Sequence, residues 1–316
     1  MESDFIKSVN FQEYSGNYHD EKEYISASGL KKLKISPMHF KEMEKVEETD
    51  AMIFGSAYHC FILEPQKFDS EFYIFDDMPI YEVLIGEGFK SPRSTKQYKE
   101  WAENEAMTIG DRKSISIQEF ESIKKMKERL FNHFYTRSLL TNGRAEIGYT
   151  GTIDTIFGEI NVKFKPDYIK DSRRLIVDLK TCQDASIDGF TRSAAEYDMH
   201  IQASFYADLL SKIEGEGQDF TFIFIAQEKK APYAFNLFEA SNQFISQGRY
   251  EYEHLLQLYK FCQDNNRWPG YQIFCQNKYG INELKLPPWA IKSLDFYDHN
   301  YSLNTINNGN KLASRN

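Results

Sequence analysis

Three charged residues stand close together in one β-rich stretch of the sequence, residues 161–181. Asp178 and Lys180 are two residues apart, so in a strand their side chains share one face while Leu179 points to the other. Asp167 is predicted on the preceding strand, where pairing would bring its carboxylate beside Asp178. Carboxylate oxygens suit a hard cation such as Mg²⁺, and a lysine beside that ion can orient the attacking water or stabilise phosphate charge. The alternative is a solvated Asp-x-Lys ion pair, which is common on amphipathic strands.

Two predicted strands, residues 162–169 and 175–179, position these groups. They flank a polar bend at residues 171–173, which is typical of a hairpin with a longer than minimal turn. Asp178 follows an apolar run and therefore lies where a buried strand ends. Pro166 directly precedes Asp167 and would interrupt a central strand, which favours an edge or a site.

A histidine is predicted on a mostly apolar helix that begins at Thr49-Asp50 and ends at Glu64-Pro65. Gly55 and His59 share a face of this helix at i, i+4, so the backbone can approach a neighbour closely below the imidazole. A histidine on an apolar helix is more often a core residue than a catalytic one, and both interpretations stay open at this stage.

A further helix is predicted over residues 194–213. Its core-facing stripe consists of Tyr197, Ile201, Phe205 and Leu209. Gln202 and Tyr206 lie one step around from that stripe, again at i, i+4, and could reach toward a cleft. Polar pairs on a helix flank usually have no function, so this pattern alone does not decide.

The remaining elements are predicted as scaffold. Ser26 or Ser28 and then Ser36-Pro37 begin short helices, and a capping box of Ser116 and Glu119 begins another, with an apolar face that includes Phe134. Residues 76–100 and 182–193 are predicted as loops. Strands are expected at 146–149, 151–157, 220–226 and 233–238, and a long helix at 242–266.

Three basic residues are candidates for contact with DNA, and one further acid is a candidate for the site. Arg93 and Lys96, in or beside the loop of residues 76–100, are solvated by default, with contact to phosphate as the minority interpretation. Lys165 lies in the strand region and is a third candidate for contact with DNA. Glu146 is a further acid near the predicted site in sequence, and a plain surface position fits it equally well.

Composition limits the possible classes of protein. The 316 residues carry 38 Lys and Arg against 47 Asp and Glu, a formal charge of −9, which argues against nonspecific coating of nucleic acid. The four cysteines show no C-x-x-C spacing, so structural zinc and a disulfide scaffold are not expected, and a reducing cytoplasm fits better. The sequence shows no bilayer-spanning run, no signal peptide and no P-loop for ATP. We therefore expect a cytoplasmic protein without a membrane partner.

With these residues assembled, the chain resembles the PD-(D/E)XK nucleases, and most of all the RecE-type exonucleases (exonuclease VIII) of phages and prophages. The matching features span residues 24–289 and are S-A-S-G-L-K-K-L with S-P soon after, T-D-A-M-I-F-G-S-A-Y-H-C-F-I-L-E-P, K-F-K-P-D, I-V-D-L-K-T with D-A-S, Q-A-S-F-Y, and A-Q-E-K-K-A-P-Y. Single elements such as D-L-K are weak signals, but their order and spacing together are specific.

The resemblance implies a fold and a set of site residues. The fold is α/β (α+β), with a mixed central β-sheet flanked by helices and a helical N-terminal portion. Asp167 and Asp178 match the two metal-binding carboxylates, and Lys180 matches the catalytic lysine. His59 matches the histidine that completes the active site, with metal ligation or phosphate contact as its role. Gln202 and Tyr206 match the Q-x-x-x-Y pattern that RecB-like nucleases place beside the metals.

The resemblance also implies an activity and partners. The family chemistry is Mg²⁺-dependent 5′-to-3′ hydrolysis of one strand of linear duplex DNA, which releases mononucleotides and leaves a 3′ single strand. Mn²⁺ is expected to substitute, and ATP is not required. Relatives form homo-oligomeric rings, here expected as a trimer or tetramer, and work with a RecT-like single-strand annealing protein. A bacterial host cell with a phage or prophage origin is therefore expected.

The predicted organisation has three parts: an N-terminal arm over residues 1–23, a single nuclease domain over 24–301, and a disordered tail over 302–316. Within the domain, residues 24–144 are mainly helical, 145–240 hold the catalytic sheet, and 241–301 hold a helix and a packing segment. Two alternatives remain for the function. One is an endonuclease or repair nuclease on the same core. The other is a binding or assembly module without catalysis, against which the complete set of Asp167, Asp178 and Lys180 argues.

Overall fold

The computed structural model describes residues 5–14, 23–42, 47–215, 219–274 and 281–291. The chain divides into two compact units, Met1–Gly270 and Tyr271–Asn316. The predicted nuclease domain of residues 24–301 spans the boundary between these units. The described part of the second unit contains two short 3-10 turns, Tyr271–Phe274 and Pro288–Ala290. The predicted disordered tail lies outside the described residues.

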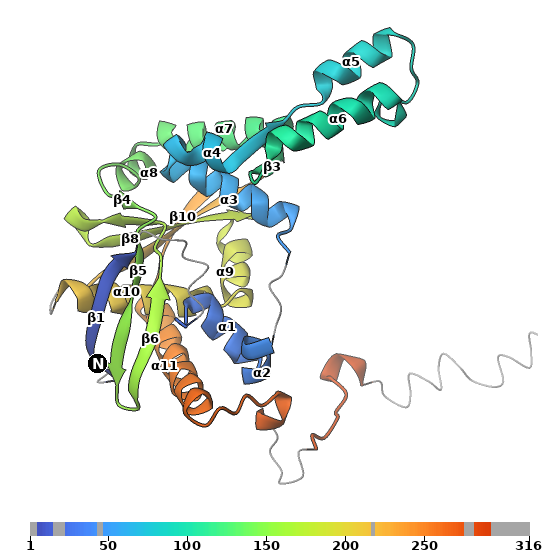
Figure 1. Ribbon diagram of the computed structural model, residues 1–316. Helices are drawn as coiled ribbons and strands as arrows, with labels where there is room; N and C mark the ends of the chain where they lie inside the picture. Colours follow the sequence, from blue (N-terminus) through green and yellow to red (C-terminus); the bar gives the residue numbers. More distant parts are fainter. Residues whose placement is uncertain (1–4, 15–22, 43–46, 216–218, 275–280, 292–316) are drawn as a thin grey trace, which may run out of the picture. The chain divides into compact units, whose positions relative to one another are not determined.

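A five-stranded mixed sheet forms the centre of the first unit, with the order β10-β9-β8-β7-β4 (Figure 1). Its middle strand β8 pairs in parallel with β9 and antiparallel with β7. The edges are formed by β10, which pairs antiparallel with β9, and β4, which pairs antiparallel with β7. The strand bounds are β4 Arg144–Ala145, β7 Tyr168–Lys170, β8 Leu175–Cys182, β9 Thr221–Glu228 and β10 Phe235–Glu239. The predicted mixed central sheet is confirmed.

A second sheet has the antiparallel order β1-β5-β6, with bounds β1 Ile6–Tyr14, β5 Gly148–Thr155 and β6 Gly158–Phe164. The expectation of a loosely held N-terminal arm is wrong for β1, because its residues pair with β5 along the whole strand. A small parallel pair, β2 Phe72–Phe75 and β3 Lys113–Ser116, completes the described strands.

The strand predicted over residues 162–169 is broken in two at residues 165–167. β6 belongs to one sheet and β7 to the other, so the predicted hairpin consists only of the short β7 and β8. Pro166 explains the break, because proline has no N–H to donate to a strand ladder. Asp167 therefore lies in a bend between the two sheets and not in a strand.

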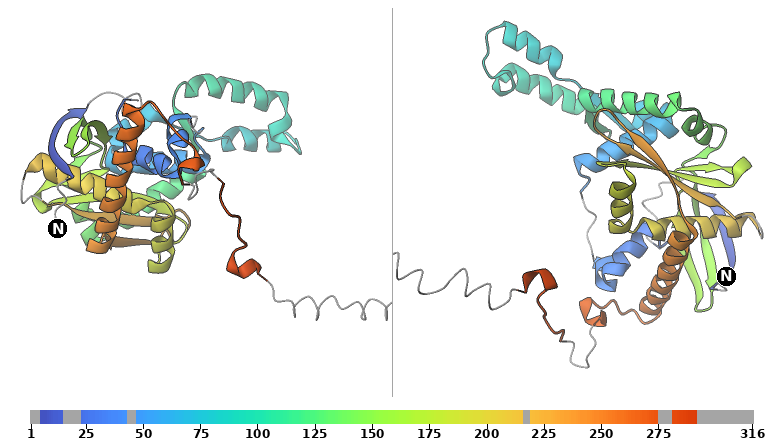
Figure 2. Two further views of the ribbon diagram at one scale, coloured as in Figure 1. Left: turned by 90° about the horizontal axis from the view of Figure 1, so that it is seen from below. Right: turned by 180° about the vertical axis from the view of Figure 1, so that it is seen from behind.

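Helices cover both faces of the central sheet, and alternate residues of β8 and β9 face two separate cores. Ile176 and Phe222 pack into one core with α1, α9, α10 and α11. Val177 and Ile223 pack into the other with α3, α7 and α8. This alternation is the period of two expected for a strand buried on both faces. Figure 2 shows the two groups of helices on opposite sides of the strands.

Several predicted helix starts are confirmed at their caps. Ser26 caps α1 Ala27–Ile35, Thr49 caps α3 Asp50–Leu63, and Ser116 with Glu119 forms the capping box of α7 Ile117–Asn132. Ser241 caps the long helix α11 Asn242–Asp264. The remaining short helices are α2 Pro37–Glu42, α4 Phe68–Glu71 and α8 Phe134–Leu139. Phe134 was expected on the buried face of α7, but it begins α8 and is 74% exposed.

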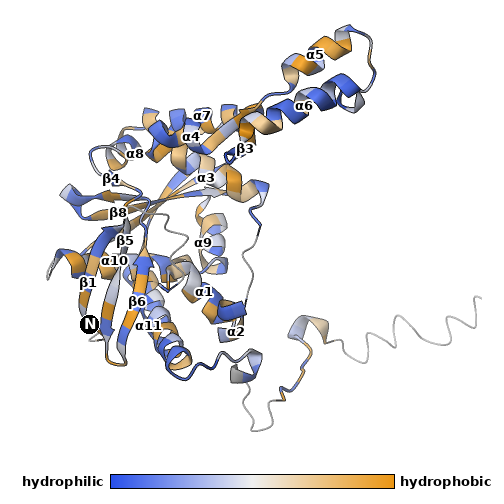
Figure 3. Ribbon diagram, viewed as in Figure 1, coloured by the Kyte–Doolittle hydropathy of each residue, from blue (hydrophilic) through white to orange (hydrophobic). Residues whose placement is uncertain are grey.

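Both predicted loops contain helices. Residues 76–100 hold α5 Met78–Gly86 and the start of α6 Lys96–Ile109, which extend side by side away from the sheets (Figure 1). α5 is mostly hydrophobic and α6 mostly hydrophilic (Figure 3). Residues 182–193 hold most of α9 Ile187–Glu196, capped by Ser186.

The helix predicted over residues 194–213 begins later, as α10 Met199–Glu214. Asp198 adopts a left-handed backbone conformation with φ 49°, which separates α9 from α10. Tyr197 therefore lies outside α10 and is 60% exposed, whereas the rest of the predicted stripe is buried. Among the described residues, no helix combines the length and apolar character that crossing a membrane requires.

Candidate active site

β8 carries the predicted Asp-x-Lys pair on one face of the central sheet. The Asp178 side chain is 1% exposed, and its Oδ1 lies 2.5 Å from Nζ of Lys180. Its Oδ2 accepts a hydrogen bond of 2.9 Å from Nε2 of Gln202 on α10. Oδ1 of Asp178 accepts no hydrogen bond of regular geometry from the part of the chain that the structure describes, although the ammonium is near. Gln202 thus holds Oδ2 of Asp178 in place, and Oδ1 faces the ammonium of Lys180.

The bend after Pro166 brings Asp167 to the same region of the sheet. The backbone N–H of Leu179 donates a hydrogen bond of 2.8 Å to Oδ2 of Asp167. Leu179 is the residue between Asp178 and Lys180, so the Asp167 carboxylate lies against the strand that carries the pair. The structure brings the three charged groups of the sequence pattern together, although not through the long hairpin that was predicted.

His59 reaches this cluster from α3. Its Nδ1 lies 3.4 Å from Oδ2 of Asp167. The adjacent Tyr58 fixes the helix, because its buried hydroxyl donates 2.7 Å to Oε1 of Gln227 on β9. A Cβ added at Gly55 would lie 3.9 Å from Oγ1 of Thr181, which is ordinary contact. The backbone approach predicted at Gly55 is therefore not unusually close.

Glu146, which the sequence left undecided, joins the cluster. Its backbone N–H donates 2.9 Å to the carbonyl oxygen of Asp167, and its φ of 54° is left-handed. Ligand atoms of His59, Glu146 and Asp167 all lie within 4.8 Å of one another. Lys165 lies 2.5 Å from Oε2 of Glu146 and so contacts an acid of the cluster. No local sequence pattern identifies Glu146, because it reaches the site through a turn between β4 and β5.

Gln202 and Tyr206 lie at different depths on α10. Gln202 contacts Asp178 directly, as described above. Tyr206 is 8% exposed, and its ring centroid lies 5.6 Å from that of Phe164 on β6. Tyr206 is therefore part of the packing between α10 and the second sheet, and its predicted place beside the metals stays a prediction.

The charges of the cluster shift one another's pKa. Burial and the neighbouring charge of Asp178 raise the pKa of Asp167 to about 8. Burial and the charge of Asp167 raise the pKa of Glu146. Burial and the positive charge of Lys180 lower the pKa of His59. Burial also opposes the charge of Lys180, but Asp178 and Asp167 outweigh it and raise the pKa of that ammonium. The carboxylates of Asp167, Asp178 and Glu146 are close together, and the nearby positive charges do not fully compensate them. Such perturbed pKa values are typical of a functional site.

The residues present fit a divalent cation. Three carboxylates and one imidazole are ligand types that divalent cations accept, and hard cations favour the oxygens. The crowded acids and the buried Oδ1 of Asp178, which lacks a regular hydrogen bond, both indicate an environment that favours added positive charge. His59, Glu146 and Asp167 are the residues that would hold such an ion, with Asp178 beside them.

Arg93 lies in the 3-10 turn Pro92–Ser94 between α5 and α6, and Lys96 is the first residue of α6. Nε of Arg93 donates 2.8 Å to Oδ2 of Asp77, and its guanidinium lies 5.1 Å from the ring centroid of Tyr81. Lys96 pairs with Glu100 at 3.2 Å. Both side chains therefore have contacts that stabilise this helical pair, and their predicted contacts to DNA stay predictions.

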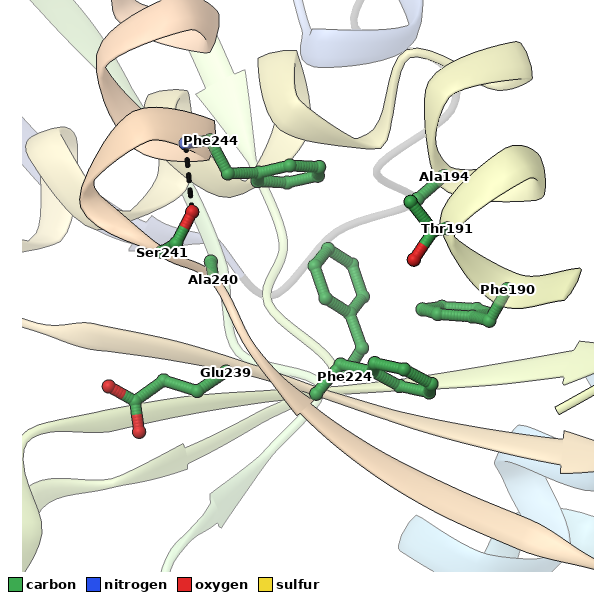
Figure 4. A pocket seen from close by; sticks show the side chains of 9 residues that line it. Phe190, Thr191, Ala194, Phe224, Glu239, Ala240, Ser241 and Phe244 are labelled. Atoms are coloured by element: carbon green, nitrogen blue, oxygen red, sulfur yellow. Dashed lines mark hydrogen bonds between the residues drawn. The ribbon is translucent and has the colours of Figure 1, made fainter. Parts of the chain in front are cut away.

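An apolar pocket lies apart from the acidic cluster, between α9, β9, β10 and the start of α11 (Figure 4). Its lining consists of Phe190, Thr191, Ala194, Phe224, Phe238, Glu239, Ala240, Ser241 and Phe244. The aromatic rings of this lining suit an apolar group and not a phosphate ester. None of the predicted site residues lines this pocket.

The sequence of this chain matches the family model of a PDDEXK-like domain of unknown function (DUF3799) over residues 26–278. The chain belongs to this family. The matched range contains Asp167, Asp178, Lys180, Glu146 and His59, so the geometry described above lies within the family's own domain. The predicted PD-(D/E)XK fold is confirmed, whereas the RecE-type branch is not decided by this match.

A crystal structure described as a "putative exonuclease" from Eubacterium rectale has a similar fold, with a TM-score of 0.54 and 16% sequence identity. The similarity covers 92% of this chain and 99% of that chain, and at this identity it shows the fold alone. The structure of SSO0001 is 13% identical with a TM-score of 0.26, covering 78% of this chain and 88% of that chain, and carries no argument. No curated protein matches the sequence.

Proposed function

We propose that the protein is a metal-dependent nuclease that hydrolyses phosphodiester bonds of DNA. The observation that carries the proposal is the meeting of Asp178 and Lys180 on the middle strand with Asp167, Glu146 and His59 from three other segments. Membership of a PDDEXK-like family supports it. A binding module without catalysis would not need a buried lysine and crowded carboxylates, which are costly to keep in a fold.

The metal proposed for this site is Mg²⁺, with Mn²⁺ as a substitute and no requirement for ATP. When bound, a divalent cation supplies a water of lowered pKa and polarises the phosphate. Asp167 and Glu146 would hold it through carboxylate oxygens. His59 is suited to ligation because its lowered pKa favours the neutral imidazole. Gln202 fixes the Asp178 carboxylate that would complete the set.

Lys180 has two tasks in this mechanism. Its raised pKa keeps the ammonium charged, so it stabilises the negative charge that develops on the phosphate and orients the attacking water by donating a hydrogen bond. Asp178 holds the lysine in place at 2.5 Å. The oxygen of that water forms the new bond to phosphorus as the water gives up a proton to solvent. The bond between phosphorus and the leaving sugar oxygen breaks, and that oxygen takes up a proton from solvent.

The finer proposal is a 5′-to-3′ exonuclease that degrades one strand of linear double-stranded DNA to mononucleotides and leaves 3′ overhangs. The resemblance to RecE-type enzymes supports this proposal, and so does the description of the Eubacterium rectale protein of similar fold as an exonuclease. On the resemblance alone, we further propose a ring of three or four copies, a RecT-like annealing partner, and action in a phage-infected or prophage-carrying bacterial cell.

Substrate topology tests the proposal. Purified protein is incubated with Mg²⁺ and either linear duplex or covalently closed circular DNA, with the linear duplex labelled at its 5′ or 3′ ends. The proposal expects loss of linear DNA, intact circles and early release of the 5′ label as a mononucleotide. Discrete fragments from circles would identify an endonuclease on the same core. No hydrolysis of any substrate would leave the binding module as the function.

A further inference from the structure

Helix α1 is anchored at both of its ends to elements that carry the active site. Before its start, Ile25 exchanges backbone hydrogen bonds of 3.0 and 2.9 Å with Asn161 and Lys163 of β6, the strand that leads into the bend at Asp167. Near its end, Nζ of Lys34 lies 2.7 Å from Oδ1 of Asp198 and 2.6 Å from Oε2 of Glu251. α1 therefore runs from the second sheet to the N-terminus of α10 and the middle of α11.

The second anchor places α1 beside Asp178. Asp198 directly precedes α10, and Gln202, four residues further along, donates to Asp178. Lys31 lies three residues before Lys34, so both side chains belong to the same side of α1. The charged groups that act on Lys31 are Lys180, Asp178, Asp198 and Lys34. Lys31 is thus a further lysine close to Asp178 and Lys180.

Lys31 differs from Lys180 and Lys34 in having no counterion. Lys180 is paired with Asp178, and Lys34 with Asp198 and Glu251. Lys31 is half-buried, and no hydrogen bond or ion pair joins it to a residue within the described ranges. Burial and the nearby charge of Lys180 lower the pKa of Lys31 to about 8. Burying an ammonium without a counterion lowers the stability of the fold, because the lost hydration is not replaced. A lysine in such a position is therefore a candidate for binding an anionic ligand.

We propose that Lys31 binds a phosphate of the DNA strand next to the bond that is cut, and thereby positions that strand over Asp178 and Lys180. The inference rests on the proposed nuclease function. The proposed contact comes from α1, a helix outside the sheet that carries Asp178 and Lys180. The ion pairs of Lys34 with Asp198 and Glu251 hold α1 in place. A phosphate oxygen of the DNA would serve as the counterion that Lys31 lacks among the described residues.

Lys31→Gln in the full chain tests this contact, with Lys32→Gln as the matched control on the same helix. Binding of linear duplex is measured by fluorescence anisotropy over a series of salt concentrations in Ca²⁺, followed by kcat and KM in Mg²⁺. Loss of one phosphate contact should lower the slope of log K against log salt by about 0.9 for duplex, or about 0.7 if the contact is to a single strand. We expect about a 10-fold weaker binding at low salt for Lys31→Gln and no change for Lys32→Gln.

Two further readouts separate a substrate contact from a structural role. Lys31→Gln removes an unpaired charge, so its Tm should stay equal or rise, whereas a structural lysine would lower Tm when replaced. Lys31→Arg keeps the charge and should restore the salt slope. A wild-type protein that hydrolyses DNA while Lys31→Gln keeps its slope and KM would overturn the inference alone. A wild-type protein that neither binds nor cuts DNA would overturn the proposed function and this inference with it.

Discussion

Replacing Asp167 by Asn should change how the stability of the metal-free protein depends on pH. Burial and the charge of Asp178 raise the pKa of Asp167 from 3.8 to about 8 in the folded state. An acid whose pKa is raised on folding stabilises the fold most at low pH, and this contribution is lost as pH rises through the folded value. The asparagine side chain of the variant would resemble the protonated acid at every pH and would still accept the hydrogen bond from Leu179.

The size of the effect follows from this pKa. For one group that titrates at 3.8 unfolded and about 8 folded, linkage removes about 4 kcal/mol of stability between pH 5 and pH 9. The interaction with Asp178 divides part of this free energy between the two acids, so the measured change should lie at or below that figure. The sign is fixed: raising the pH should stabilise Asp167→Asn relative to the wild type.

Urea unfolding in EDTA at pH 5, 7 and 9 measures the effect as the difference between variant and wild type. Taking the difference cancels the titration of all other groups, to the extent that they do not couple to position 167. Asp264→Asn is the control, because Asp264 is an exposed carboxylate whose ion pair is with Lys260 on the same helix. The difference between this variant and the wild type should be flat from pH 5 to pH 9. A flat difference for Asp167→Asn as well would show that Asp167 is not held in a crowded acidic site.

Substitutions at three more residues test separate parts of the site. Lys180→Gln keeps a hydrogen-bond donor beside Asp178 but loses the charge, so the turnover of labelled duplex should fall at least about 100-fold, measured below the melting temperature of the variant. The same change leaves the buried Asp178 carboxylate without its counterion and should lower Tm. Gln202→Glu replaces the hydrogen-bond donor to Asp178 by a second negative charge and should lower turnover about 10- to 100-fold. Gln202→Ala only removes the donor, so its turnover should fall less. Tyr58→Phe leaves Oε1 of Gln227 without its partner and should lower the free energy of unfolding by about 1–3 kcal/mol, measured in urea, with kcat retained below the melting temperature.

The sequence predicted those parts of the site that follow from the regular spacing of side chains along a strand or a helix. Asp178 and Lys180 share a face because side chains in a strand alternate. In the same way, the position of Gln202 on a buried helix left it at the edge of the core, where it reaches Asp178. Helix caps at Ser26, Thr49 and Ser116 were equally readable, because capping depends on a few adjacent residues.

The contacts that depend on tertiary structure were not predictable in this way. Glu146 enters the cluster through a left-handed turn, and the anchoring of α1 brings Lys31 near Asp178. Neither position has a local sequence pattern that differs from that of an ordinary surface residue. Pro166 was recognised as a strand breaker, yet the sequence did not show that the chain passes from one sheet to another there. In residues 76–100, glycines and prolines concealed a pair of helices, because local turn signals do not show how far a helix extends between them.

The central claim is that the acidic cluster hydrolyses DNA with a divalent cation. Release of nucleotides from labelled linear duplex tests it most directly, with wild type, Asp178→Asn and the control Asp264→Asn compared in Mg²⁺ and in EDTA. We expect release by the wild type and Asp264→Asn in Mg²⁺, none by any protein in EDTA, and none by Asp178→Asn in either condition. Release by Asp178→Asn at the wild-type rate, or undiminished release in EDTA, would contradict the claim.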